Sequence, residues 1–151
     1  MAQQQINVRD LIFQVSDGAA VPTWTQLGGL QEGGVNWGAN EAVEDTTVWA
    51  DNGNYSEEVM QRGAELSLKG RSLMDPATGV RDPGQAQVIA NAAKVAVASK
   101  VQARFRYPGE PNWIVWACTV KRGEESGGTN NKVPFDYKFT RCGVPTTTPA
   151  P

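Results

Sequence analysis

The chain has 151 residues and a formal net charge of −2, and 40% of its residues are hydrophobic. This composition is sufficient for one domain with a hydrophobic core and is too apolar for a disordered chain. The sequence contains 16 glycines, 9 prolines and no histidine. Without histidine, these residues cannot provide a Ser-His-Asp or Cys-His catalytic centre, a histidine metal site or a histidine pH switch.

The sequence also lacks the signals of membrane insertion and secretion. No segment approaches the roughly 18 continuous apolar residues of a membrane span. Met1–Ile6 has neither the basic nor the apolar region of a secretory signal. We therefore expect a cytoplasmic setting, in which Cys118 and Cys142 are reduced. A disulfide between two neighbouring strands is the alternative.

Alternation of apolar and polar residues predicts several strands. These segments are 10–15, 24–30, 64–73, 101–107, 113–121 and 135–140. Segment 113–121 is apolar on both faces, which is typical of a strand buried on both sides, in the core or at a subunit contact. The glycine pairs at 28–29 and 33–34, and the segment Asn36–Gly38, predict turns.

A long polar segment, 40–62, precedes the strand that begins at residue 64. Residues 43–49 are rich in β-branched and aromatic side chains, and Asp51-Asn52-Gly53-Asn54 is a strong turn signal. Residues 55–60 then lead the chain back alongside residues 43–49. We interpret 40–62 as a long acidic hairpin or ordered loop.

Residues 82–99 have the one convincing helical pattern. Asp82 suits the N-cap, Pro83 suits the first helical position, and Gln85 completes a capping-box-like start. Apolar residues share one face of this segment and polar residues the other. The apolar set is Val88, Ile89, Ala92, Val95 and Ala96, and the polar set is Gln87, Asn91 and Lys94. We expect the helix to end near Ser99 and to pack on a sheet.

The order of several strands, one helix and three further strands indicates a mainly β fold. We predict an antiparallel β-sandwich or barrel with one flanking helix at about 82–99 and a long ordered loop at about 40–62. Residues 1–143 form this single domain. Residues 144–151 are rich in proline and threonine and are expected to be a flexible tail.

The small net charge conceals two parts of opposite sign. Residues 1–93 contain 5 basic and 12 acidic residues, a net charge of −7, and residues 94–151 contain 9 basic and 4 acidic residues, a net charge of +5. Glu41–Glu58 is the densest acidic segment and contains no lysine or arginine. It is either a solvated loop or an acidic surface that meets a basic surface of another copy.

Basic residues of later strands form either an ordinary solvated face or the docking surface for this loop. They are Arg104, Arg106, Lys121 and Arg122.

Patterns for catalysis or metal binding are weak. Glu44-Asp45 and Glu57-Glu58 are adjacent carboxylates, which point to opposite faces of a strand and do not converge on one bond. Asp51–Asn54 has oxygen ligands at short spacing but lacks the downstream glutamate of a calcium loop, and turn chemistry explains it. Cys118 has no neighbouring base and is assigned to the core. We predict no enzymatic activity, no cofactor and no metal.

The region from residue 43 to residue 70 resembles the tail tube proteins of long-tailed bacteriophages. It contains Glu44-Asp45-Thr46-Thr47 at the opening of a long loop, then the Asn52-Gly53-Asn54 turn and the strand Gly63-Ala64-Glu65-Leu66-Ser67-Leu68-Lys69-Gly70. In that family a helix follows, then a Phe-Arg-bearing strand and two more strands. The corresponding segments here are Asp82–Ser99, Arg104-Phe105-Arg106, Trp113–Arg122 and Val133–Cys142. The resemblance extends over about residues 7–143.

The resemblance implies a virion tail subunit that forms hexameric rings, which stack head to tail into a hollow tube for double-stranded DNA. It implies assembly in the host bacterial cytoplasm, inner sheets that join into a continuous barrel, and tape-measure, terminator and distal tail proteins as partners. It also implies that the loop at 40–62 contacts the neighbouring ring. We assign to this contact Glu41, Glu44, Asp45, Thr46, Thr47, Trp49, Asp51, Tyr55, Glu57 and Glu58.

Two other functions are alternatives. One is a different ring component of a tail or secretion tube, such as a tail terminator or a secreted ring protein. The other is a carbohydrate-binding β-sandwich module, because flat aromatic faces stack on sugars. Trp24 and Trp37 flank glycine turns and are candidates for exposure, whereas Trp113 and Trp116 have opposite parities and do not form one platform.

Overall fold

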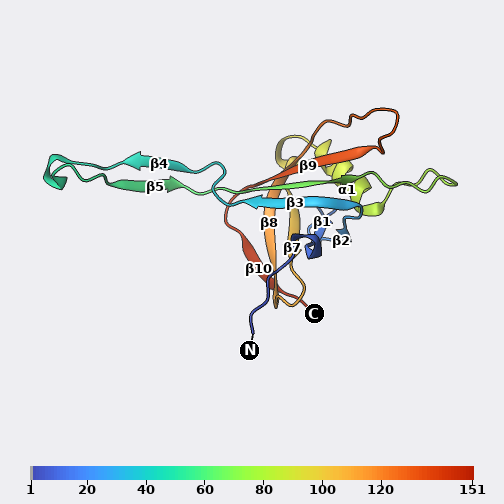
Figure 1. The fold of residues 1–151 in the computed structure, drawn as a ribbon, viewed down its shortest axis with the longest axis horizontal. Helices are drawn as coiled ribbons and strands as arrows, with labels where there is room; N and C mark the ends of the chain where they lie inside the picture. The colour runs from blue at the N-terminus through green and yellow to red at the C-terminus, as the bar shows by residue number, and fades with distance from the viewer. Residues whose placement is uncertain (1) are drawn as a thin grey trace.

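The computed structural model describes residues 2–151, which form antiparallel strands and one α-helix (Figure 1). The strands are β1 (Ile12–Ser16), β2 (Trp24–Gln26), β3 (Leu30–Asn36), β4 (Ala42–Asp45), β5 (Glu57–Gln61), β6 (Glu65–Arg71), β7 (Val101–Arg106), β8 (Asn112–Arg122), β9 (Pro134–Arg141) and β10 (Thr146–Pro149). The helices are α1 (Pro83–Ala92) and the short 3-10 segments η1 (Val8–Asp10), η2 (Trp49–Asp51) and η3 (Ala96–Ser99). Within the described residues, no helix is both long and apolar enough for a membrane crossing.

The main sheet has the strand order β2-β1-β7-β8-β9-β6-β3, and β10 also pairs with β8. The long strand β8 has two neighbours on one side, because Cys118–Arg122 pairs with β9 and Asn112–Val115 pairs with β10. The sheet folds over on itself: Phe13 of β1 and Phe139 of β9 pack with their ring centroids 4.8 Å apart. This arrangement confirms an antiparallel, sandwich-like fold with one helix. It is not a closed barrel, because within residues 2–151 strands β2 and β3 each pair on one side only.

The core lies between the two halves of the folded sheet. Alternate residues of β6, β7 and β9 point inward, as the sequence alternation predicted. The buried inward set is Leu66, Leu68, Val101, Ala103, Phe105, Phe135, Tyr137 and Phe139. On β8, Trp116 and Cys118 are buried on the inner face and Trp113 and Val115 on the outer face, whereas Ala117 is exposed. The prediction of burial on both faces is therefore right for the first half of β8.

Helix α1 begins as predicted but is shorter. The Asp82 carboxylate accepts a hydrogen bond from the Gln85 N–H at 3.1 Å, which caps the first turn. The helix ends at Ala92 and cannot continue to Ser99, since Val95 is extended with φ −127° and Ala96 has φ +54°. The predicted apolar face is therefore wrong at its end, where Val95 is 77% exposed.

The polar face of α1 also differs from the prediction. Asn91 is buried, and its Nδ2 donates to the Ser16 carbonyl at 3.0 Å. The Lys94 ammonium donates to the Asp17 carbonyl at 3.1 Å. These two bonds attach the end of the helix to the end of β1, where the backbone carbonyls of a finishing strand need donors.

Two predicted loop regions are strands. Gly33 and Gly34 lie inside β3 and pair with Leu68 and Ser67, because β6 supplies a regular partner that outweighs the turn tendency of glycine. The tail expected to be flexible contains β10, in which Thr146 pairs with Val115 and extends the sheet beside β8. Its side chains are exposed, so main-chain pairing rather than burial holds it.

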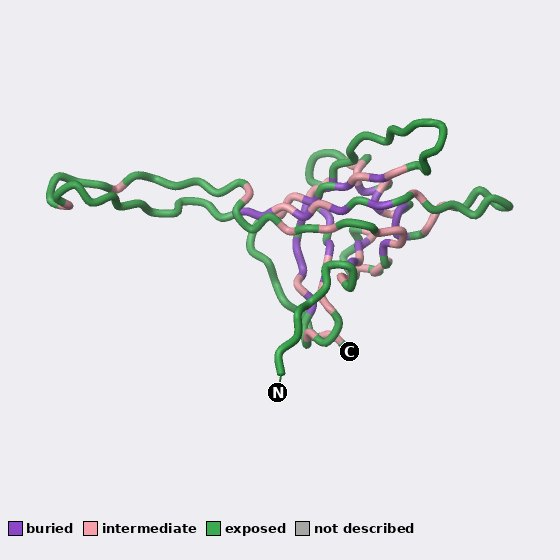
Figure 2. Tube along the Cα trace, in the orientation of Figure 1, coloured by how far each residue is buried: buried purple, intermediate pink, exposed green. Residues whose placement is uncertain are grey.

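The segment expected to be a hairpin or ordered loop is a hairpin of β4 and β5 that projects far from the sandwich (Figure 1). Every residue of the two strands is exposed (Figure 2). We refer to residues 40–62 as the hairpin. It contributes nothing to the core and is formed by its own β4–β5 ladder and turn hydrogen bonds.

Candidate self-association surface

The tip of the hairpin is built from the Asp51–Asn54 turn signal. The Asp51 carboxylate accepts a hydrogen bond from the Val48 N–H at 2.7 Å, and the Asn54 side chain donates to the Asp51 carbonyl at 2.9 Å. Asn52 and Gly53 have φ values of +52° and +84°, the left-handed conformation that these residue types tolerate. The Asp51 carboxylate, which would be a ligand in a calcium site, is thus already bonded within the turn.

Like charges face each other across the hairpin. In the β4–β5 register, Glu44 lies directly opposite Glu58, and Asp45 lies directly opposite Glu57. Directly opposed like charges destabilise an antiparallel pair, and an isolated two-stranded ribbon is marginal in water. Within residues 2–151, no lysine or arginine lies within 4.0 Å of these four carboxylates. The monomer therefore leaves two acidic pairs without counter-charges.

Polar groups of the hairpin compensate one of these pairs. The Asp45 carboxylate accepts the Thr47 N–H at 2.9 Å, and hydrogen bonds from Thr47 hold the pKa of Asp45 below its usual value. The Tyr55 hydroxyl donates to Glu57 at 2.7 Å, and this bond raises the pKa of Tyr55. The carboxylates of Glu44 and Glu58 have no such hydrogen-bond donor among the described residues.

The hairpin also exposes apolar side chains beside the acidic ones. Trp49 at the tip is fully exposed, and Tyr55 and Met60 are about two-thirds exposed. Val43 and Val59 are half-exposed and face each other across the strands. Exposed apolar side chains therefore lie along the strands and at the tip of the hairpin, interspersed with the carboxylates.

The base of the hairpin is anchored to the sandwich. Trp37, in the turn before β4, packs edge-on against the core residue Trp116 with centroids 5.8 Å apart. The Arg62 guanidinium binds the Glu41 carboxylate at 3.0 Å, which ties the two strands together where they leave the body. The hairpin is thus held at its base and projects freely beyond it (Figure 1).

Two of the four predicted basic residues lie together on the outer face of β7. The guanidinium carbon of Arg104 lies 4.4 Å from the ring centroids of both Trp24 and Trp113, and that of Arg106 lies 4.9 Å from Trp113. Gln14 accepts a hydrogen bond from Arg104 Nε at 2.8 Å. We call Trp24, Arg104, Arg106 and Trp113 the Arg–Trp cradle.

The other two basic residues lie elsewhere. Lys121 shares the outer face, but it is six residues along β8 from the partner of Arg104, a separation of about 20 Å. Arg122 is engaged by Glu125 at 2.8 Å. The structure therefore assembles Arg104 and Arg106 with two tryptophans and does not bring Lys121 and Arg122 to the same place.

The cradle also bears on the carbohydrate alternative. Trp113 is 4% exposed and has two arginines over its ring. Trp24 is covered by Arg104, and Trp37 packs on Trp116. Trp24 and Trp113 are thus covered by arginines, whereas Trp37 is 55% exposed, as predicted, and makes only an edge contact with Trp116. The exposed rings of Trp37 and Trp49 lie at the base and the tip of the hairpin and do not form one stacking platform.

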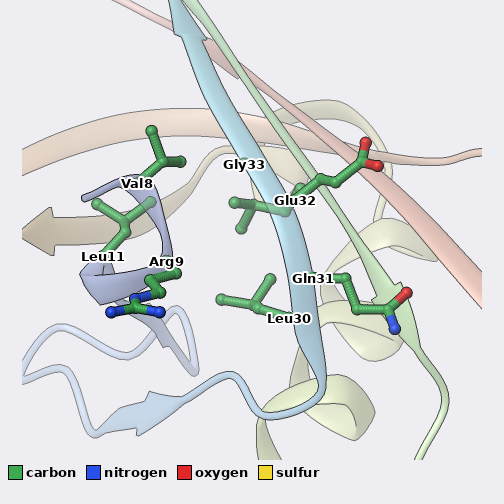
Figure 3. A pocket seen from close by; sticks show the side chains of 8 residues that line it. Val8, Arg9, Leu11, Leu30, Gln31, Glu32 and Gly33 are labelled. Atoms are coloured by element: carbon green, nitrogen blue, oxygen red, sulfur yellow. The ribbon is translucent and has the colours of Figure 1, made fainter.

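A cavity of about 440 Å³ lies between η1 and β3. Its inner wall is aliphatic, since Val8, Leu11 and Leu30 point into it while Gln31 and Glu32 point to the far side of the strand (Figure 3). It lies beside the open side of β3, opposite the side that pairs with β6. The backbone at this edge is available for pairing with another chain.

The two cysteines are free. Cys118 is buried on the inner face of β8, and burial raises the pKa of its thiol to about 12. This environment agrees with the assignment of Cys118 to the core.

No protein-family model and no curated protein matches the chain. Solved structures do match its fold. A chain in the virion of a native gene transfer agent particle is 15% identical, with a TM-score of 0.65 over 97% of this chain and 99% of that chain. A chain in the tail of an empty gene transfer agent particle, refined helically with C6 symmetry, is 17% identical, with a TM-score of 0.67 over 97% and 99%. The chain therefore shares its fold, over nearly its full length, with chains of gene transfer agent particles.

Proposed function

We propose that this chain is a structural subunit that self-assembles into stacked hexameric rings. The rings form the hollow tail tube of a virion or phage-like particle, through which double-stranded DNA passes. Assembly takes place in the bacterial cytoplasm, with tape-measure, terminator and distal tail proteins as further partners. The chain acts as a building block and not as an enzyme.

The observation that carries this proposal is the projecting hairpin. It is ordered and anchored at its base, yet it buries nothing and leaves Glu44 and Glu58 unneutralised. A contact with another copy accounts for both properties, because it buries the exposed apolar residues and supplies counter-charges. A contact between unlike surfaces repeats from copy to copy and generates rings or filaments.

Two further observations support the proposal. The fold is similar, over 97% of this chain, to a chain of a tail refined with C6 symmetry. Strands β2 and β3 leave two open edges on opposite ends of the sheet, and edge-to-edge pairing of six copies would join the sheets into a continuous barrel.

Negative-stain electron microscopy and light scattering of the purified protein test this function. We expect long hollow tubes with six-fold symmetry in projection. Single closed rings would instead favour a terminator-like or secreted ring component. A monomer whose properties shift with oligosaccharide would favour a carbohydrate-binding module.

A hairpin deletion is the matched variant. Residues 43–60 are replaced by Asn-Gly, which forms a tight turn between Ala42 and Gln61, a cross-strand pair in the register. We expect a folded, soluble monomer, because the deleted residues make no core contact. Tubes that still form would show that the hairpin is not the assembly element.

A further inference from the structure

We propose that Glu44 and Glu58 on the hairpin of one copy bind Arg104 and Arg106 in the Arg–Trp cradle of another copy. This inference rests on the proposed self-assembly and adds to it the surface that receives the hairpin. The partner is a second copy of this chain.

The receiving arginines lack acidic partners. Within residues 2–151, no carboxylate lies within 4.0 Å of the guanidinium of Arg104 or Arg106. The nearby Glu110 carboxylate accepts from the Tyr107 N–H at 3.2 Å, and Arg106 donates to the Glu110 carbonyl instead. Two arginines thus stand side by side without counter-charges, as two glutamates do on the hairpin.

The cradle holds these arginines in place before any partner arrives. Arg104 is clamped between Trp24 and Trp113 and is bonded to Gln14, while Arg106 rests on Trp113. Both arginines are half-buried, and the Arg106 Nε is buried without a hydrogen-bond partner. Fixed guanidinium groups lose little entropy on binding, and tryptophan and arginine dominate the energetically important positions of interfaces.

The spacing of the two pairs is compatible. Arg104 and Arg106 are two residues apart on one face of β7, a separation of about 7 Å. Glu44 and Glu58 are a directly opposed cross-strand pair, with Cβ atoms about 5 Å apart. Guanidinium and carboxylate groups form strong, charge-assisted, two-pronged pairs. Met60, two residues from Glu58 along β5, is also exposed.

Other pairings are less favourable. Asp45 and Glu57 already accept hydrogen bonds from Thr47 and Tyr55 on the opposite face of the hairpin. Lys138, which is paired with Lys121 across β8 and β9, has Glu65 at 3.9 Å. The contact is between copies rather than within one, because the hairpin projects away from the body that contains β7 (Figure 1).

Reciprocal charge reversal tests the proposal. We expect that E44K/E58K and R104E/R106E each form no tubes alone, as seen by negative stain and sedimentation. When the two variants are mixed, the lysine hairpin of one fits the glutamate cradle of the other, and the native hairpin fits the native cradle. We therefore expect tubes to return in the mixture to at least half of the wild-type pelleted mass.

The control variant is E124Q/E125Q, which removes the same charge from the exposed loop after β8, outside the hairpin. We expect it to assemble within twofold of the wild-type critical concentration, whereas E44Q/E58Q raises that concentration tenfold or more. Equal effects of the two variants would overturn the proposal, and so would a mixture of the reversed variants that forms no tubes.

A crosslink provides a second test that does not depend on the folding of the arginine variants. A photoreactive phenylalanine derivative in place of the exposed Met60, which leaves Glu44 and Glu58 intact, should crosslink to residues 102–116 of another copy, as identified by mass spectrometry. Crosslinks confined to other surfaces in wild-type-like tubes would overturn the cradle while leaving the proposed function intact. Normal tubes from R104Q/R106Q that are altered only in DNA retention would also overturn it. Failure of the wild-type chain to form tubes or rings would reject the proposed function itself.

Discussion

Asn91 on α1 donates a hydrogen bond from its Nδ2 to the backbone carbonyl of Ser16 at the end of β1, 3.0 Å away. Both residues are buried. The Ser16 hydroxyl in turn accepts the Gln102 N–H at 3.1 Å, so the helix, β1 and β7 meet at this point. This amide attaches the C-terminal end of the only α-helix of the described chain, while the buried Gln85 near its start donates to the Gly28 and Arg71 carbonyls at 3.0 Å.

Replacing Asn91 with leucine should destabilise the protein. The substitution leaves the buried Ser16 carbonyl without its donor, and an unsatisfied buried group costs about 1–3 kcal/mol. Urea unfolding followed by circular dichroism measures this difference. Ala90→Ser, on the exposed side of the same helical turn, is the control and should stay within about 0.5 kcal/mol of the wild type. An N91L midpoint equal to that of wild type would contradict the assigned role.

Gly70 should not tolerate alanine. A Cβ at this position would lie 2.0 Å from the Gly29 carbonyl oxygen and 2.7 Å from the Phe135 ring, and the backbone atom cannot move aside easily. We expect G70A to lose 2 kcal/mol or more, about the upper range of overpacking effects. Gly34→Ala is the matched control, because it also lies in a strand and has no atom within 4 Å of the new Cβ. Thermal melting of the two variants should separate them clearly.

Sequence patterns predicted the parts of this fold that depend on local chemistry. The alternation in 101–107 and 135–140 revealed the inner faces, because each strand has one buried side. The Asp51–Asn54 turn and the Asp82 N-cap are formed by neighbouring residues, and both are present. The same kind of local turn signal predicts the hairpin.

The parts that were missed depend on partners distant in sequence. In the helical pattern Asn91 falls on the polar face, and its burial depends on a hydrogen bond to Ser16, which is 75 residues earlier in the chain. Strand β10 forms because β9 pairs with only the second half of β8, which leaves the first half of β8 free to pair on that side. The Arg–Trp cradle forms only when β2, β1, β7 and β8 pair in the observed register. The spacing of residues within any one segment does not reveal that register.

The hydroxyl of Thr47 should control the titration of Asp45. Hydrogen bonds from the Thr47 side chain and then its N–H lower the pKa of Asp45 in the folded hairpin. Folding therefore favours the ionised form of Asp45. The resulting stabilisation of the folded hairpin is present above about pH 3.9, the pKa of an unfolded aspartate, and is lost as the pH falls through the lower folded pKa. In T47A we expect the pKa of Asp45 to rise, as measured by NMR titration. The pKa of Asp75, which is lowered by Ala77 and Thr78, should not change.

Cys118 should resist alkylation in the folded protein. Its thiol is buried, and burial raises its pKa to about 12, so the thiolate that reacts is scarce at pH 8. In C142S, the remaining thiol should react with iodoacetamide orders of magnitude more slowly than in urea. Fast labelling of native C142S, measured by mass spectrometry, would show that the β8 core opens readily.

Reversing all four opposed carboxylates of the hairpin should abolish assembly without unfolding the subunit. The E44K/D45K/E57K/E58K variant keeps a like-charge pair at each register position, so the internal repulsion of the hairpin is similar to that of wild type. The variant also loses the hydrogen bonds that Asp45 and Glu57 accept from Thr47 and Tyr55, but these lie in the exposed hairpin and outside the core. Its complementarity to a basic surface is inverted. We expect unchanged circular dichroism and melting temperature, a monomer in light scattering and no tubes in micrographs. Glu124→Lys, in an exposed loop outside the hairpin, is the control for a surface charge reversal and should assemble normally. Tubes of normal length from the fourfold variant would show that electrostatic contact by the hairpin is dispensable.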